Sequence, residues 1–186
     1  EAKLAVKNAP TSVIVWENLA TIYRSFLGVA ANADTWAIAA LAQAMQLDPT
    51  NPSLLMQLGS IYLRTNRMDE AISSFQQAIA LKNDLANAHY NLAYAYRQKK
   101  EYGKAAMELR KTNQFVTSGS ADQDRLNAEL SEVMSKLTNE EITAVSKAPL
   151  EPQPTKKEEV LSPTSEFAPL PSPALTLPSG SQPPNQ

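Results

Sequence analysis

The chain repeats itself at a spacing of 34 residues, and this repeat restricts the fold more than any other feature of the sequence. The stretch NPSLLMQLGSIYLRTNRMDEAISSFQQAIALKND is followed by LANAHYNLAYAYRQKKEYGKAAMELRKTNQF. At this offset large apolar residues match large ones and small residues match small ones. The matched pairs are Leu58 with Leu92, Gly59 with Ala93, Tyr62 with Tyr96, Ala71 with Ala105, Phe75 with Leu109, and Ala78 with Thr112.

Each unit carries the periodicity of two helices. The residues with helical spacing are Leu55, Leu58 and Tyr62 in the first half of a unit and Ala71, Phe75 and Ala78 in the second. Each set lies on one helix face, and the polar stretch TNRMD separates the two. One helix–turn–helix cannot bury both stripes, so neighbouring units must stack. The sequence therefore predicts an all-α solenoid.

These positions carry a resemblance to a known family. Leu58-Gly59, Tyr62, Ala71, Phe75 and Ala78 are similar to the tetratricopeptide repeat (TPR) pattern, in which W-x2-L-G-x2-Y is followed by A-x3-F and a closing proline. Asn83 replaces that proline in this unit. The resemblance implies a TPR solenoid in which the first helices of successive units line a concave, non-catalytic groove for peptides or partner helices.

The same pattern places two further units and a capping helix. Trp16, Leu19 and Tyr23 match the first helix of an upstream unit, which is five residues longer than 34, and the match puts the extra residues in FLGVAANAD. We expect TPR units at 13–51, 52–85 and 86–118. Ser120 and Gln123 have the spacing of a capping box and precede an amphipathic stretch. We therefore expect one capping helix at 120–138.

The two ends of the chain differ from the repeats. Ten of the 13 prolines lie between Pro149 and Pro184, which predicts a disordered, partly polyproline tail over 146–186. At the other end, residues 5–10 align with residues 44–49 at the end of a second helix. We therefore expect residues 1–12 to be the remnant of an upstream repeat, so that the chain is the C-terminal piece of a longer protein.

Composition and motifs exclude several function classes. The net charge of −2 gives no reason to expect nucleic acid as a partner, and the absence of cysteine excludes disulfides and thiolate metal sites. No stretch is long and apolar enough to span a bilayer. We expect no enzyme activity, cofactor or metal, because no nucleophile–base pair or ligand cluster is present. His89 is the only histidine, and its place in the repeat favours packing over chemistry.

Candidate binding residues follow from the groove that the resemblance implies. They are the first-helix residues outside the core stripes, namely Arg24, Met56, Ser60, Arg64, Tyr90, Tyr94 and Arg97. Aromatic and methionine side chains give contact area at low entropic cost. The expected exposed pair Tyr90 and Tyr94 serves either peptide binding or packing between repeats.

The arginines also allow two interpretations. A guanidinium row favours an acidic or carboxylate-bearing peptide, whereas an arginine near a helix C-terminus is already favoured by the helix dipole. The dicarboxylate clamp of chaperone-binding family members is matched only at Asn91.

Two functional hypotheses remain. The first is an interaction scaffold that binds a peptide or partner helix in its groove. The second is an assembly or regulatory appendage, because YRSFLGVAANADTWAIAALAQAMQLDPTNP resembles TPR regions appended to bacterial membrane proteins of the O-antigen polymerase and ligase type. Neither the compartment nor the identity of the partner follows from the sequence.

Overall fold

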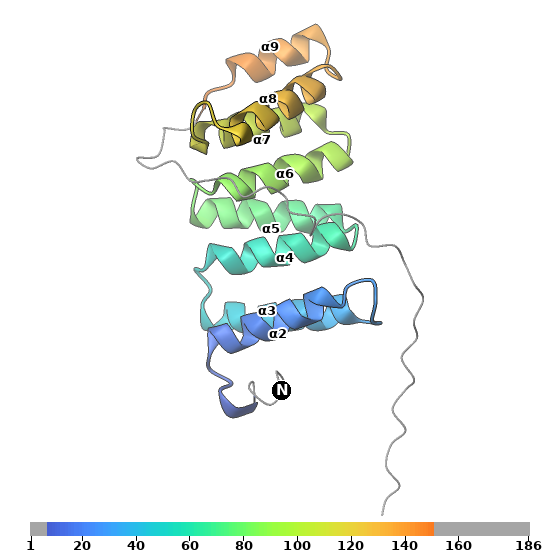
Figure 1. Cartoon of the computed structure of the whole chain (residues 1–186), viewed down its shortest axis with the longest axis vertical. Coiled ribbons are helices and arrows are strands. Elements are labelled where there is room, and N and C mark those ends of the chain that lie inside the picture. The colour runs from blue at the N-terminus through green and yellow to red at the C-terminus, as the bar shows by residue number, and fades with distance from the viewer. Residues whose placement is uncertain (1–6, 151–186) are drawn as a thin grey trace, which may run out of the picture. The chain divides into compact units, whose positions relative to one another are not determined.

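The computed structural model describes residues 7–150, and the regular elements of this part are all α-helices (Figure 1). The described chain forms two compact units, residues 7–47 and residues 48–150. The predicted all-α fold is confirmed for these residues. Residues 1–6 of the expected repeat remnant, and the expected tail from residue 151 onward, lie outside the described residues.

The first unit is a helical hairpin of α2 (Val13–Ser25) and α3 (Ala33–Leu47). Small and medium apolar side chains fill the interface between the two helices, and the buried ones include Leu19, Ala20, Ala37, Leu41 and Ala44. The connection at 26–32 has seven residues, whereas each hairpin turn in the second unit has three. The extra length expected in this repeat therefore falls mainly in the connection.

The second unit begins with two hairpins of nearly equal length. They are α4 (Pro52–Arg64) with α5 (Met68–Leu81), and α6 (Ala86–Gln98) with α7 (Tyr102–Phe115), and α5 packs against α6. Two local signals start α4, because Asn51 accepts a hydrogen bond from the Ser53 amide at 3.0 Å and Pro52 occupies the first turn.

Gly59 allows α4 to approach α5 closely. A Cβ atom built on Gly59 would lie 2.5 Å from Cε1 and 2.7 Å from Cζ of Phe75. Phe75 is fully buried, so its ring has no free space into which to move. The small residue at this position is therefore required by the packing of the hairpin, as the repeat pattern predicts.

The two hairpin turns of the second unit repeat each other in their backbone geometry. Asn66 and Lys100 both adopt positive φ angles, 59° and 62°. The following residue donates its amide to the carbonyl of Tyr62 in one turn and of Tyr96 in the other, at 2.8 and 2.9 Å. The 34-residue repeat therefore extends from the side-chain pattern to the main chain.

Two helices, not one, follow the last repeat. They are α8 (Ala121–Met134) and α9 (Asn139–Lys147), and both pack against α7. The apolar face expected on α8 is confirmed, since Leu126 and Val133 are buried and Leu130, Met134 and Leu137 pack against the core. The expected single helix at 120–138 is wrong, because the chain turns after Met134 and Thr138 starts a new helix.

The start of each of these helices is capped. Ser120 accepts a hydrogen bond from the Gln123 amide at 3.2 Å, but the Gln123 side chain accepts from the amide of Gly119, one residue earlier than a full capping box requires. The complete capping box lies at Thr138 and Glu141, at the start of α9. Arg110 of α7 donates to the carbonyl of Val145 and so holds α9 against α7.

Candidate functional site

Six of the seven candidate residues lie on the first helices of the two hairpins in the second unit. Met56, Ser60 and Arg64 are on α4, and Tyr90, Tyr94 and Arg97 are on α6. We call these six residues the α4–α6 face. The two helices contact each other, and the side chains of Met56 and Tyr94 pack, partly buried, against the same apolar cluster. The seventh residue, Arg24, is half-buried in the last turn of α2 in the first unit.

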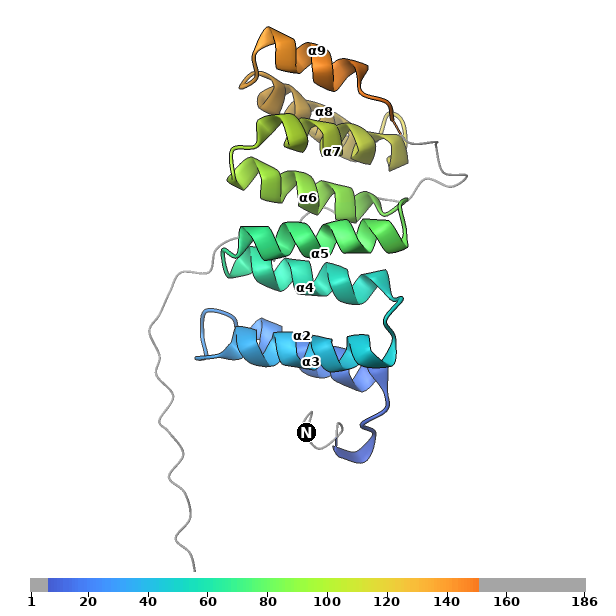
Figure 2. The ribbon, with the colours of Figure 1, turned by 180° about the vertical axis from the view of Figure 1, so that it is seen from behind.

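Tyr90 is not exposed, and that part of the expectation is wrong. Only 4% of its surface is accessible, and it belongs to the apolar core of the second unit. Its hydroxyl donates to Glu129 of α8 at 2.8 Å. Helix α8 passes in front of α7 in Figure 1 and behind it in Figure 2, so α8 lies on the first-helix side of the unit. Tyr90 is therefore an anchor for α8, and Tyr94 is the more accessible of the two tyrosines.

Glu129 is the meeting point of several side chains on this side of the second unit. Besides the Tyr90 hydroxyl, Arg97 Nη1 lies 3.7 Å and Arg125 Nε lies 3.9 Å from its carboxylate oxygens. The Arg97 guanidinium also lies 5.5 Å from the centre of the Tyr94 ring. We call Tyr90, Tyr94, Arg97, Arg125 and Glu129 the Glu129 cluster. Two guanidinium groups and one phenol thus surround a single carboxylate.

The electrostatics of the cluster favour a neutral phenol at Tyr90. Burial raises the pKa of the Tyr90 hydroxyl well above its usual value, and the hydrogen bond to the Glu129 carboxylate raises it further. Tyr90 therefore remains a hydrogen-bond donor throughout the neutral range. The cluster can bind a carboxylate through one O–H group and two guanidinium groups.

The three candidate arginines occupy similar places in their helices. Arg24, Arg64 and Arg97 are each the basic residue in the last turn of a first helix, where the helix dipole favours a cation. Arg97 has in addition the carboxylate of Glu129 and the ring of Tyr94 beside it. At Arg97, therefore, a role in carboxylate binding and a preference set by the helix dipole are compatible.

His89 is fully buried, in agreement with the packing role expected from the sequence. Its Nδ1 lies 2.6 Å from Glu108 of α7, its Nε2 lies 3.0 Å from the Asn83 carbonyl, and its ring stacks on Phe115. Burial alone raises the pKa of the Glu108 carboxyl, but the His89 hydrogen bond and the Lys111 charge outweigh it and leave the pKa below its usual value.

Sequence reasoning missed three residues of these arrangements, Glu108, Arg125 and Glu129. Glu108 occupies the position that Ser74 has in the preceding repeat. The repeat that contains this carboxylate also has a histidine, His89, at the position where the TPR pattern has an aromatic residue. Arg125 and Glu129 are four residues apart and flank the apolar stripe of α8. For Glu108 the signal was a change of residue type at a repeat position, which is visible only once the register is known, whereas Arg125 and Glu129 lie in α8, outside the repeats, and carry no such signal.

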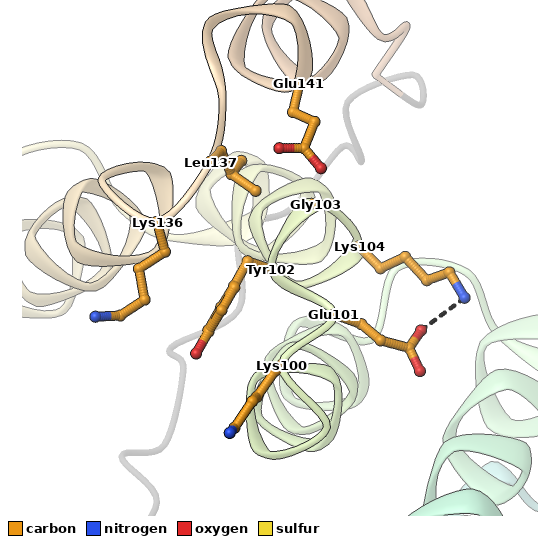
Figure 3. A pocket seen from close by; sticks show the side chains of 8 residues that line it. All are labelled: Lys100, Glu101, Tyr102, Gly103, Lys104, Lys136, Leu137 and Glu141. Carbon is orange, nitrogen blue, oxygen red and sulfur yellow. Dashed lines mark ion pairs between the residues drawn. The ribbon is translucent and has the colours of Figure 1, made fainter.

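A shallow pocket of about 280 Å³ lies where the α6–α7 turn meets the α8–α9 turn (Figure 3). The polar ends of Lys100, Tyr102 and Lys136 lie on one side of it, and Lys104 is turned the other way toward Glu101, at 2.7 Å. Lysines and glutamates are mixed in its lining. This mixture selects neither an anion nor a cation.

Within 7–150, no group of three or more histidine, cysteine, aspartate or glutamate side chains is placed to hold a metal ion. No helix in that part of the chain has the length and apolar character needed to cross a bilayer.

Family models identify the repeats directly. A model described as "Tetratricopeptide repeat" matches residues 36–74, and one described as "TPR repeat" matches residues 59–100. The chain contains tetratricopeptide repeats. Both matches overlap the hairpin of α4 and α5 in the second unit.

Known structures and one curated relative extend the comparison of this TPR protein. A crystal structure of MamA is 25% identical, covers 77% of this chain and 86% of its own, and gives a TM-score of 0.54. The TPR domain of Arabidopsis OM64 gives 0.55 at 12% identity over 64% of this chain and 94% of its own, which shows the fold alone.

The peroxisomal targeting signal receptor of Kluyveromyces lactis is 28% identical over 86 residues, which are 43% of this chain and 15% of the receptor. The TPR protein therefore spans a small part of that relative. Together the matches support a protein-interaction scaffold. The resemblance to O-antigen polymerase and ligase appendages stays a prediction.

Proposed function

We propose that this TPR protein binds an extended, acidic polypeptide segment on the α4–α6 face. The observation that supports the proposal is the convergence of Tyr90 and Arg97, two residues of that face, on the carboxylate of Glu129. A partner carboxylate would find the guanidinium groups of Arg97 and Arg125, which are suited to bidentate contact, while the buried Tyr90 hydroxyl holds Glu129 in place.

Side chains of α4 add apolar contact area to the proposed binding surface. Met56 packs, partly buried, against the same cluster as Tyr94, and a flexible thioether beside an aromatic ring adapts to varied side chains. The Ser60 hydroxyl donates to the Met56 carbonyl at 2.9 Å, so it leaves only its lone pairs for a partner. Partly exposed ion pairs contribute about 0.5–1 kcal/mol each, so apolar contact must supply most of the binding free energy.

Glu129 has a defined part in this proposal. It occupies the donors that an incoming carboxylate would use, so it competes with the partner. Replacing Glu129 with glutamine keeps a hydrogen-bond acceptor for Tyr90 but removes the competing charge. We expect Glu129→Gln to raise the affinity for an acidic peptide by roughly threefold to tenfold, a change of about 0.6–1.4 kcal/mol.

The test compares two labelled decapeptides by fluorescence anisotropy. One has four glutamates, and the other has glutamine at the same four positions. We expect the acidic peptide to bind more tightly, with an affinity that falls as salt is added. Arg97→Gln should remove this preference. Arg67→Gln, the same change on an exposed arginine of the α4–α5 turn, should leave the preference unchanged.

Two outcomes would contradict the proposal. Equal binding of the two peptides would show that the face does not select carboxylates. An Arg97→Gln protein that retains the full preference, with unchanged circular dichroism, would place the acidic site elsewhere.

A further inference from the structure

The α4–α6 face and the neighbouring side of α8 carry an excess of positive charge. Their arginines are Arg64, Arg97 and Arg125, and their carboxylates are Glu129 and Asp122, the second of which lies 4.0 Å from Arg125. The side chains of Arg97 and Arg125 are 28% and 40% exposed to solvent. An incoming carboxylate can therefore reach both guanidinium groups, whether it belongs to a partner or to this chain.

One stretch of the chain beyond the described residues has the chemistry that the α4–α6 face is proposed to select. It is EEVLSPTSEF, residues 158–167, which we call the acidic segment. The acidic segment contains three of the four carboxylate side chains between residues 151 and 186, the one aromatic residue of that range, Phe167, and no lysine or arginine. Pro163 disfavours helix formation within it. The segment therefore offers negative charge together with apolar side chains, the two features that the proposed peptide needs.

The acidic segment is close enough in the chain to reach this face. The described residues end at Leu150, just after α9, and α9 contacts α7, which contacts α6. Packed helices lie about 8–10 Å apart, so α6 is roughly 16–20 Å from α9. The eight residue steps from Leu150 to Glu158 can span up to about 26 Å when extended. The acidic segment can therefore lie across α6, and its own length can carry it as far as α4.

We propose that the acidic segment occupies the α4–α6 face of its own chain and competes there with external partners. This inference rests on the proposed function, because the face selects the segment by the same chemistry. Carboxylates of the segment contact Arg97 and Arg125, and its apolar side chains pack against Met56 and Tyr94. The chain thereby carries a regulator of its own binding site.

Tethering makes even a weak contact of this kind effective. A tether of this length keeps the segment at an effective concentration on the order of 1 mM near the face. If the free segment binds with a Kd of about 0.3 mM, the tethered segment lowers the apparent affinity for an external peptide by about fourfold. An external partner must therefore bind more tightly than the segment in order to displace it.

The first experiment measures competition in the full chain, with the same labelled acidic decapeptide as the external ligand. The segment variant, Glu158→Gln with Glu159→Gln, removes two carboxylates from the acidic segment. Its matched control, Glu140→Gln with Glu151→Gln, removes the same charge from the start of α9 and from a position before the segment. We expect the segment variant to bind the decapeptide about threefold to fourfold more tightly than the wild type, and the control to change the affinity by less than about twofold.

A second pair of variants tests the apolar part of the contact without changing the charge. Leu161→Ser with Phe167→Ser alters the acidic segment, and Leu170→Ser with Leu175→Ser is the matched control beyond it. The first variant should also strengthen decapeptide binding, and the second should not. In an Arg97→Gln background the gain should disappear, because the segment and the decapeptide then lose the same contact.

A spin label locates the segment without any external peptide. The sequence has no cysteine, so Ser165→Cys provides a single attachment site for a nitroxide. We expect the amide NMR signals of Arg97 and Arg125 to lose intensity, and the signal of Gln77, exposed on α5, to lose less. The loss should decrease at high salt, because the contact is partly ionic. Since this measurement does not involve the decapeptide, failure of this inference can be told apart from failure of the proposed function.

Three results would overturn the proposal. If the decapeptides show the expected acidic preference, but the segment variants match their controls and Arg97 keeps its signal, the segment does not occupy the face and the proposed function stands alone. Equal intensity loss on α6 in the Arg97→Gln protein would place the segment elsewhere. Loss seen only between separate molecules would assign the face to the segment of a second copy. Intensity loss at Arg97 without any acidic preference for external peptides would instead support this inference and refute the external partner.

Discussion

The contact between Gly59 and Phe75 gives the sharpest stability prediction. In Gly59→Ala the new methyl group would lie 2.5–2.9 Å from three ring carbons of Phe75, where no Cβ atom is normally found. Overpacking of this kind costs about 1–3 kcal/mol, while replacing glycine by alanine within a helix returns about 1 kcal/mol. We expect a net loss of about 1 kcal/mol for Gly59→Ala and about 2–3 kcal/mol for Gly59→Leu.

Two further variants test the same contact. One is a glycine-to-alanine control that should stabilise the protein, and the other is a second substitution that should restore the stability lost in Gly59→Ala. Gly103 of α7 has no atom within 4 Å of its would-be Cβ, so Gly103→Ala should stabilise by about 0.5 kcal/mol. In the next repeat the Gly59 and Phe75 positions hold Ala93 and Leu109. Phe75→Leu alone leaves a cavity and should cost about 1–2 kcal/mol, whereas Gly59→Ala combined with Phe75→Leu recreates the Ala93–Leu109 pair.

The assay is urea unfolding followed by helicity, because both tryptophans lie in the first unit and their emission does not report on the second. The wild type, Gly59→Ala, Phe75→Leu and the double variant form a double-mutant cycle. We expect a favourable coupling free energy of at least about 1 kcal/mol between the two substitutions. Additive costs in the cycle, or a Gly59→Ala protein as stable as Gly103→Ala, would refute the close approach of α4 to α5.

Three further predictions concern single sites. Lys100→Gly should stabilise the second unit by about 0.5–1 kcal/mol in urea unfolding, because Lys100 has a φ of 62° that glycine adopts without strain; Lys99→Gly, at a negative φ, should not. The lowered pKa of Glu108 contributes stability that is present above its unfolded value of 4.5 and is lost as the pH falls through the folded pKa, so Glu108→Gln should flatten that part of a pH–stability curve. Thr138→Ala should remove the capping box of α9 and cost about 1 kcal/mol locally, which amide exchange within α9 would detect without change in α4–α7.

The sequence predicted those parts of the fold that repeat. The stripe spacing located the helices of all three repeats, and the small residue at Gly59 indicated a close contact before any partner was known. Helix α9 escaped prediction because its stretch, NEEITAVSK, is short and mostly polar and buries Val145 as its one core residue. A periodicity argument needs several buried positions, and α9 does not provide them.

The candidate site was predicted less well, for a related reason. Repeat register shows which residues of a first helix point away from its own core, but it does not show what covers them at the end of the array. Tyr90 and Tyr94 have the same status in the sequence, yet α8 buries Tyr90 and leaves Tyr94 partly accessible. The position of Glu129 depends on how α8 packs against α7, and one chain contains no second example of that packing.

The buried His89 and Glu108 pair also constrains how the sequence can change. The Asn83 carbonyl only accepts hydrogen bonds, so His89 Nε2 must carry a proton, and Nδ1 and the carboxylate must share one more. Replacing His89 alone with the aromatic residue that the TPR pattern has at this position would leave the Glu108 carboxylate without its His89 partner. Among related chains, histidine at this position should occur together with a carboxylate 19 residues later, and both should be replaced together by apolar residues.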